Sequence, residues 1–229
     1  MDAHNTNRNN IFKHKLRIDD MTPALRWHTA AIIAFLAFAA SFHSLDLQLA
    51  IWIKSHIVPE LTLFFRKLTL LGQSEWYLVP GILIFLVFRK QNPALSRGSL
   101  FIFSSVALSG LAADLLKYLL PRARPAVYFH ENIYGFKDFT LWHGWENSWN
   151  SFPSGHSATA FSAAAVFSIL FPKFRFLFFS AAAIIALSRI AVGKHYLSDV
   201  IAGSFLGFGT AVLLFNLYFR PKPDAQAIP

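Results

Sequence analysis

Long apolar stretches alternate with short polar segments along the whole chain. A helix needs about 20 mostly apolar residues to cross a bilayer. Six stretches approach this length, some of them with an isolated charge: 27–45, 74–88, 98–120, 154–171, 175–192 and 200–219. The pattern predicts an all-α integral membrane protein, a helical bundle with about six transmembrane helices.

One further segment, 44–72, mixes apolar and polar residues. An amphipathic helix that lies on the outer surface of the membrane fits this mixture. A partly buried loop outside the membrane fits it equally well, so both interpretations stay open at this point.

The composition supports a membrane protein. Of the 229 residues, 55% are hydrophobic and 14% are charged, whereas soluble domains average about 25% charged residues. Cysteine is absent, which excludes disulfides and thiolate chemistry. A net charge of +9 would suggest nucleic acid as a partner of a soluble protein, but membrane proteins carry basic residues at helix ends and in cytoplasmic loops. We therefore expect the lipid bilayer, and no nucleic acid, as a partner.

Basic residues fall mainly on one side of the predicted bundle, which the positive-inside rule places in the cytoplasm. The basic residues on that side are Arg8, Lys13, Lys15, Arg17, Arg26, Arg89, Lys90, Arg97, Lys173, Arg175, Arg220 and Lys222. The predicted organisation is a cytoplasmic polar arm at 1–25, a six-span membrane domain at 26–220 and a cytoplasmic tail at 221–229. Extracytoplasmic loops are expected at about 44–73 and 121–153.

The first apolar stretch could be read as a cleaved signal peptide, because Ala37-Phe38-Ala39 resembles a cleavage site. A polar arm of about 26 residues precedes the stretch, however, and the apolar run continues past the site. We expect an uncleaved membrane anchor.

Ionisable and small polar residues gather at the predicted extracytoplasmic ends of three helices. A charge inside a bilayer is costly, so such residues indicate a functional site. The clusters are Lys117, Arg122 and Arg124; Ser154, Gly155 and His156; and Arg189, His195 and Asp199. Taken singly, they could be cations that reach the headgroups, a simple helix cap and a surface His–Asp pair.

The first two clusters suit an anion. Pro121 and Pro125 end a helix beside three cations, and fixed cations attract an anion. Ser154 can cap the next helix, and Gly155 lets the backbone approach a ligand closely. The free N–H groups at that helix N-terminus form an anion site.

The third cluster suits a base or a nucleophile. His195 and Asp199 are four residues apart, and they share a face if the last helix begins near Lys194. The carboxylate would then accept a proton from one ring nitrogen and leave the other nitrogen free to react. The sequence contains no carboxylate cluster suited to Mg²⁺, so Lys and Arg would neutralise a phosphate in its place.

The three motifs together resemble the tripartite signature of the type 2 phosphatidic acid phosphatase family, which shares its site with vanadium haloperoxidases and bacterial acid phosphatases. The matching segments are Lys117-x6-Arg124-Pro125, Pro153-Ser154-Gly155-His156 and Ser188-Arg189-x5-His195-x3-Asp199. The resemblance implies a membrane phosphatase that works through phosphohistidine, with neither a metal ion nor another cofactor.

The resemblance also implies a role for each matched residue. His195 would attack phosphorus, Asp199 would orient it, and His156 would protonate the leaving oxygen. The phosphate oxygens would be held by Lys117, Arg124, Ser154, Gly155 and Arg189. Arg122 lies outside the matched positions and receives no role.

The predicted function is hydrolysis of a lipid phosphate or pyrophosphate, because a site at the membrane surface meets amphiphiles first. Four substrates fit: undecaprenyl pyrophosphate, phosphatidylglycerol phosphate, phosphatidic acid and lipid A phosphate. The expected location is a bacterial inner membrane, with the site on the extracytoplasmic side. A lipid-phosphate binding or transport protein and a vanadium-dependent haloperoxidase are the alternatives, and the oligomeric state is left open.

The loop 121–153 contains nine aromatic residues and could be a lipid entrance, a lid or a self-packed loop. Gly203 and Gly207 form a small-x-x-x-small pattern, which we expect to pack helices closely within the bundle.

Overall fold

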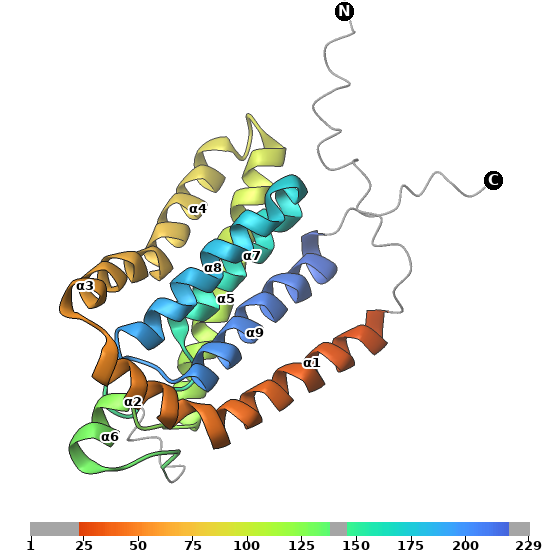
Figure 1. The fold of residues 1–229 in the computed structure, drawn as a ribbon. Coiled ribbons are helices and arrows are strands. Elements are labelled where there is room, and N and C mark those ends of the chain that lie inside the picture. The colour runs from red at the N-terminus through yellow and green to blue at the C-terminus, as the bar shows by residue number, and fades with distance from the viewer. Residues whose placement is uncertain (1–22, 138–145, 220–229) are drawn as a thin grey trace, which may run out of the picture.

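The computed structural model describes residues 23–137 and 146–219, which form a helical bundle (Figure 1). The predicted arm and tail therefore lie almost wholly outside the described residues, as does part of the aromatic loop. The helices are α1 (Pro23–Ala40), α2 (Asp46–His56), α3 (Pro59–Leu68), α4 (Glu75–Phe88), α5 (Pro93–Leu119), α6 (Pro125–Glu131), α7 (Gly155–Leu170), α8 (Arg175–Ala191) and α9 (Leu197–Leu214).

Within the described ranges, five helical stretches are long and apolar enough to span a membrane: His28–His56, Pro59–Phe88, Pro93–Leu119, Pro172–Ala191 and Leu197–Phe219. The shorter apolar helix α7 accompanies them. This result confirms the predicted all-α membrane bundle of about six helices.

The mixed segment 44–72 is helical apart from a break at residues 57–58. A π-helical segment, Ser41–Leu45, joins α1 to α2 without a break, and α3 continues into a 3₁₀ turn at Thr69–Gly72. The first span is thus longer than its apolar stretch, because the helix continues through Asp46.

Helix α7 lies at the centre of the bundle, where it packs against α5, α8 and α9 (Figure 1). Its inward residues are small, and Ala158, Ala163 and Ala165 are almost fully buried. Small side chains let helix backbones approach closely in a membrane. This packing holds the start of α7 close to the ends of its neighbours.

Helices α7 and α9 are in backbone contact at two glycines. A β-carbon added at Gly203 would lie 2.3 Å from the carbonyl oxygen of Ser154, and one added at Gly207 would lie 2.0 Å from that of Ala158. Neither position has room for a side chain. The small-x-x-x-small pattern therefore serves packing within the bundle, as expected.

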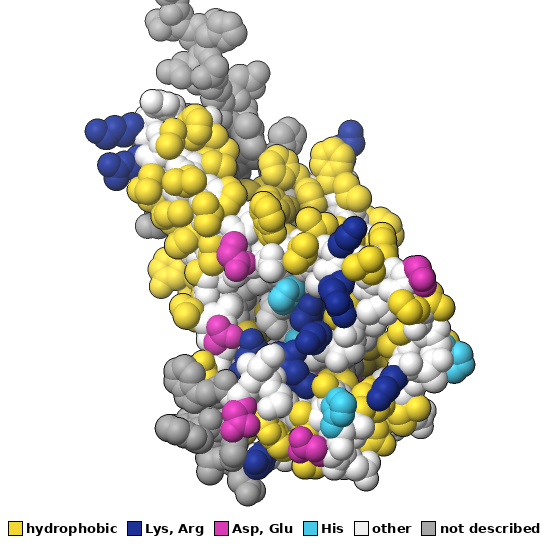
Figure 2. All heavy atoms as spheres, turned by 90° about the vertical axis from the view of Figure 1, so that its left-hand side faces the viewer, with side chains coloured by type: hydrophobic (Ala, Val, Ile, Leu, Met, Phe, Trp, Pro, Cys, Tyr) yellow, Lys and Arg dark blue, Asp and Glu magenta, His cyan; other side chains and the backbone are white. Residues whose placement is uncertain are grey.

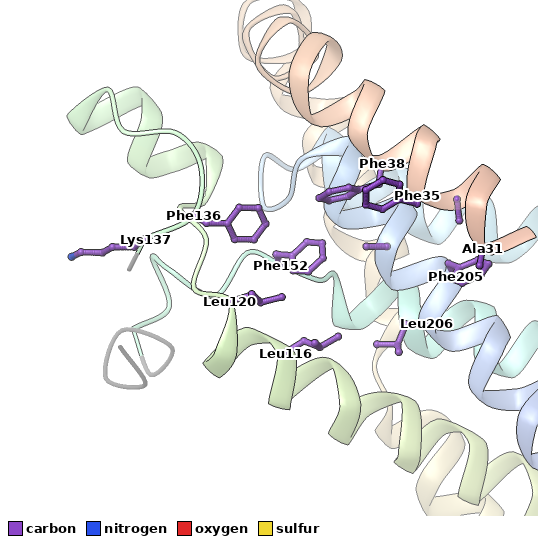
Figure 3. A pocket seen from close by; sticks show the side chains of 12 residues that line it. Ala31, Phe35, Phe38, Leu116, Leu120, Phe136, Lys137, Phe152, Phe205 and Leu206 are labelled. Carbon is purple, nitrogen blue, oxygen red and sulfur yellow. The ribbon is translucent and has the colours of Figure 1, made fainter. Parts of the chain in front are cut away.

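Helix α1 leans away from the rest of the bundle and contacts α9 (Figure 1). An apolar pocket of about 630 Å³ lies between α1, α5 and α9 (Figure 3). Phe136 and Phe152 of the aromatic loop line this pocket and contact each other edge to face. Phe152 also meets Phe38 of α1, so the described part of the loop packs against the bundle.

Candidate active site

The three sequence motifs meet at one end of the bundle. Lys117 lies in the last turn of α5, Arg124 precedes α6, and Arg189 lies in the last turn of α8. His156 lies in the first turn of α7, within electrostatic range of these three cations and of His195. Figure 2 shows Lys and Arg side chains gathered beside a His side chain in a hollow of this face.

His195 does not lie on a helix, because α9 begins at Leu197 rather than near Lys194. Its Nδ1 lies 2.7 Å from the carbonyl oxygen of Ser151. A carbonyl only accepts, so Nδ1 must carry the proton and donate. In the neutral ring, Nε2 then keeps its lone pair and can act as a nucleophile.

The direct partner of the His195 ring is therefore the backbone of Ser151 and not the carboxylate of Asp199. Oδ2 of Asp199 lies 3.7 Å from Nδ1, which is too far for a hydrogen bond. The expectation that the His195 ring donates a hydrogen bond to Asp199 is therefore wrong, because the ring donates to the Ser151 carbonyl. At 3.7 Å the carboxylate still stabilises positive charge on the ring electrostatically.

Burial lowers the pKa of His195 to about 4. The charges of Arg124 and Arg189 act in the same direction, and Asp199 opposes them. At neutral pH the ring is uncharged, which is the form that a nucleophilic histidine needs.

Asp199 is fully buried in the first turn of α9 and is held by three neighbours. It forms an ion pair with Arg122, accepts a hydrogen bond of 2.6 Å from the hydroxyl of Ser151, and accepts one of 2.9 Å from the N–H of Tyr196. The bond from Tyr196 caps the helix and adds a favourable charge at its N-terminus. Arg122, which the motif comparison left without a role, is thus its charged partner.

The side chain of Lys117, from α5, lies beside the N-terminus of α7. A β-carbon added at Gly155 would lie 3.4 Å from its Nζ, so the glycine leaves room for the ammonium group. Lys117 also pairs with Asp114 at 2.8 Å, one turn earlier on α5. The ammonium group and the free N–H groups of α7 can together bind an anion.

The guanidinium group of Arg189 has one N–H donor without a hydrogen-bond partner among the described residues. Its Nη1 donates to Oγ1 of Thr69 at 2.8 Å, while its Nε is buried without a hydrogen-bond partner among the described residues. A buried guanidinium N–H without a partner is costly, and a phosphate oxygen would satisfy it. Motif spacing does not indicate Thr69, which lies in the turn after α3.

The same turn contacts His156. A β-carbon added at Gly72 would lie 3.2 Å from the His156 ring, so a larger residue would press on it. Gly72 is a second residue that motif spacing does not reveal.

Arg124 ties three segments together. Its Nη2 donates to Oδ1 of Asn150 at 2.6 Å, its Nε to the carbonyl of Asn147 at 2.6 Å, and its Nη1 to the carbonyl of Lys194 at 3.1 Å. Burial lowers its pKa, although an arginine stays charged at neutral pH. Arg124 therefore brings a positive charge to the loop that carries His195.

Ser154 is buried and acts as the cap of α7. Its hydroxyl oxygen accepts from the N–H of Ser157 at 3.4 Å and from the hydroxyl of Ser157 at 2.9 Å. Its own hydroxyl proton is left to donate. Among the described residues, no group of three or more His, Asp or Glu side chains is placed to hold a metal ion.

Residues 98–223 match the family model described as the PAP2 superfamily. The chain belongs to the PAP2 superfamily. The match includes all three motifs and more than half of the chain, but it leaves out α1 to α4.

Curated relatives extend the PAP2 match over most of the chain. A lipid A 1-phosphatase of Rhizobium etli is 35% identical over 210 residues, which is 86% of this chain and 88% of the relative. A lipid A 1-phosphatase of Rhizobium johnstonii is 33% identical over 222 residues, which is 88% of this chain and 87% of the relative. This PAP2 protein is a membrane lipid phosphatase.

Solved PAP2-type structures share the fold. Aquifex aeolicus LpxE aligns with a TM-score of 0.55 and 24% identity, over 77% of this chain and 98% of LpxE. A PAP2-type phosphatidylglycerolphosphate phosphatase from Bacillus subtilis aligns with a TM-score of 0.62 and 22% identity, over 86% of this chain and 98% of that one. At these identities the likeness concerns the fold alone.

Proposed function

We propose that this PAP2 phosphatase hydrolyses a lipid phosphate through a phosphohistidine formed at Nε2 of His195. The observation that carries the proposal is the 2.7 Å contact between Nδ1 of His195 and the Ser151 carbonyl. That contact places the ring proton on Nδ1, and burial keeps the ring neutral. Nε2 is therefore prepared to attack before any substrate arrives.

In the first step, Nε2 attacks phosphorus and the bond to the lipid oxygen breaks. His156 takes up a proton when the negatively charged phosphate binds beside it, and it donates this proton to that oxygen, which leaves as the lipid alcohol. Lys117, Arg124 and Arg189 balance the charge on the phosphate oxygens, together with the Ser154 hydroxyl and the N–H of Gly155. These are the groups that the three motifs predict to bind the phosphate.

In the second step, water attacks the phosphohistidine. His156, now neutral, takes a proton from the water as the phosphorus–nitrogen bond breaks. Inorganic phosphate leaves and the His195 ring returns to its starting tautomer. The residues that carry these two steps need no metal ion.

Lipid A 1-phosphate is the substrate that we propose first. The supporting observation is that two lipid A 1-phosphatases match 86% and 88% of the chain. Undecaprenyl pyrophosphate, phosphatidylglycerol phosphate and phosphatidic acid are the competing substrates. We further propose a bacterial cytoplasmic membrane with the site on the extracytoplasmic side, because most basic residues of the sequence belong to the terminal segments and short loops that the positive-inside rule assigns to the cytoplasm.

The test is phosphate release from the detergent-solubilised full-length protein in the presence of EDTA. The four lipids are offered in parallel, and His195→Gln is compared with His28→Gln, which changes an exposed histidine at the far end of α1. We expect release by the wild type and by His28→Gln, none by His195→Gln, and the highest kcat/KM with lipid A 1-phosphate. Activity in His195→Gln would overturn the nucleophile, and a higher kcat/KM with another lipid would overturn the substrate.

The intermediate can be tested directly. Substrate with a labelled phosphate should transfer the label to the wild-type protein on rapid quenching, in a bond that is stable to base and labile to acid. His195→Gln should remain unlabelled. A catalytic cycle with no protein-bound label at any quenching time would contradict phosphohistidine. Vanadate should inhibit the enzyme, whereas a haloperoxidase would require it.

A further inference from the structure

Asp46 is a buried carboxylate whose role none of the three motifs explains. It lies in the first turn of α2, is 1% exposed and falls outside the residues that match the family model. Burial of a charged group is costly unless other groups pair with it and donate hydrogen bonds to it. The position of Asp46 therefore calls for a partner of opposite charge.

That partner is Arg122, which joins Asp46 to Asp199. Its Nη2 lies 2.7 Å from Oδ2 of Asp46, while its Nη1 pairs with Oδ1 of Asp199. Both carboxylates and the guanidinium are fully buried. One arginine thus connects α2 with the first turn of α9, and the forked guanidinium is the group that can serve two carboxylates at once.

Further contacts fix this Asp46–Arg122–Asp199 triad. Ser198 donates its N–H to Asp46 at 2.9 Å, and Arg122 donates to the Ser198 hydroxyl at 2.7 Å. The centre of the guanidinium lies 4.7 to 5.5 Å from the ring centres of Phe42, Tyr134, Phe136 and Tyr196. Burial alone would lower the pKa of Arg122, but Asp199 and Asp46 raise it above its ordinary value.

Arg122 also holds Ser151, whose carbonyl orients His195. The Arg122 carbonyl accepts from the N–H of Ser151 at 3.1 Å, and the Arg122 N–H donates to the carbonyl of Trp149 at 2.6 Å. The Ser151 hydroxyl donates to Asp199, which Arg122 holds from the other side. Ser151 is therefore fixed through its backbone and through its side chain by the same arginine.

We propose that Asp46 and Arg122 are positioning residues for the reaction, acting on His195 through Asp199 and Ser151. This inference rests on the proposed function, because it takes His195 as the nucleophile. When Nε2 attacks phosphorus, the ring becomes positively charged while Nδ1 keeps its proton. The triad has two carboxylates for one guanidinium, and its excess negative charge stabilises that developing cation.

The proposal gives the first membrane helix a part in catalysis. Helix α1 runs without a break into α2, so docking of this segment brings the second carboxylate to the triad. The phosphate cradle of Lys117, Arg124 and Arg189 does not include Asp46. A change at Asp46 should therefore alter the rate of attack and leave phosphate binding nearly unchanged.

The test compares Asp46→Asn, Asp46→Glu and Ser198→Ala in the full-length protein. Asp46→Asn keeps a hydrogen-bond acceptor and removes the charge. We expect its kcat and its rate of phosphoenzyme formation to fall by on the order of 10- to 100-fold, with KM and vanadate inhibition changed less than about threefold. Asp46→Glu, which restores the charge, should recover part of the rate.

Ser198→Ala tests the same proposal if the Asp46→Asn protein does not fold. It removes a hydroxyl that contacts both Arg122 and Asp46, and we expect kcat to fall by about fivefold. The matched control is Ser162→Ala, another fully buried serine hydroxyl, which has no hydrogen-bond partner in the described structure. This control should keep the wild-type kcat.

The outcomes separate this inference from the proposed function. If the wild type depends on His195 but Asp46→Asn or Ser198→Ala turns over at the wild-type rate, the positioning role is wrong. It is also wrong if these variants lose only the amount of folded protein, with kcat per folded molecule unchanged. If His195→Gln itself stays active, it is the nucleophile assignment that fails.

Discussion

His195 donates the proton on Nδ1 to the carbonyl oxygen of Ser151, 2.7 Å away and 44 positions earlier in the chain. The acceptor that sets the reactive tautomer is thus a backbone group that no substitution of the Ser151 side chain removes. The side chain of Ser151 has a separate task, because its hydroxyl donates to Asp199 at 2.6 Å.

Ser151→Ala should therefore slow the enzyme without inactivating it. The Ser151 carbonyl still accepts from His195, but Asp199 loses one of its donors. A hydrogen bond to a charged group contributes about 1.5–3 kcal/mol, so we expect kcat to fall by roughly tenfold. Steady-state assays alongside His195→Gln measure this, and a loss as complete as that of His195→Gln would contradict the division of roles.

His156→Gln should affect substrates according to their leaving groups. A lipid alkoxide needs a proton to depart, whereas a nitrophenolate leaves without one. General acid catalysis contributes about 10²- to 10⁴-fold, so we expect a loss of this order for the lipid and a much smaller loss for p-nitrophenyl phosphate. Equal losses on the two substrates would show that His156 is not the acid.

Thr69→Val should weaken phosphate binding more than turnover. The hydroxyl of Thr69 accepts from Nη1 of Arg189, and its loss leaves that guanidinium free to shift. We expect KM and the vanadate inhibition constant to rise by about 3- to 10-fold. Thr62→Val on the same segment is the control, because the Thr62 hydroxyl only bonds to its own helix. An unchanged inhibition constant in Thr69→Val would exclude a role for Thr69 in the cradle.

The buried ring of His195 should make the folded protein sensitive to acid. Its pKa is about 4 in the folded protein and about 6.5 in an unfolded chain. Between these values the unfolded chain binds more protons, so this contribution to stability is complete above about pH 6.5 and is lost as the pH falls toward 4. The expected loss is about 1.4 kcal/mol for each pH unit within this window.

Thermal unfolding of the wild type and His195→Gln between pH 8 and pH 4 measures this effect. The Tm of the wild type relative to that of His195→Gln should fall steadily below pH 6.5. A difference that stays constant over the whole range would mean that His195 titrates normally.

Gly203→Ala should destabilise the bundle. The added methyl would collide with the Ser154 carbonyl at 2.3 Å, and overpacking costs about 1–3 kcal/mol. Gly209→Ala on the same helix is the matched control, because no atom lies within 4 Å of an added β-carbon there. It should leave the Tm unchanged or raise it slightly, since alanine favours helix. Equal Tm values for the two variants would contradict the contact.

The sequence predicted the bundle, and it pointed to the residues that we propose for the phosphate cradle, because both follow from local patterns. An apolar run can be recognised within a window of 20 residues, and each of the three motifs can be recognised by the spacing of its residues. A direct His195–Asp199 hydrogen bond was conditional on a helix that begins near Lys194. Helix α9 begins at Leu197 instead, and the His195 ring donates to the Ser151 carbonyl.

The residues that the sequence missed act through tertiary contacts. Asp46 follows directly on the first apolar stretch and lies outside the three motifs, yet it accepts a hydrogen bond from Ser198, 152 positions away. The partner of His195 is a carbonyl group, which every residue possesses, so no residue type could mark Ser151. Arg122 was visible between the motif residues, but its partners lie on α2 and α9.

The contact between Gly203 and Ser154 affects how the helices of the enzyme tilt in membranes of different thickness. Transmembrane helices respond to hydrophobic mismatch by tilting. Because no side chain separates α7 from α9, and because Ser154 donates its N–H to the carbonyl of Asp199 at 3.0 Å, the two helices must tilt as one unit. His156 begins α7 and His195 lies two residues before α9, so we expect the separation between the proposed acid and the proposed nucleophile to change little with the lipid composition around the protein.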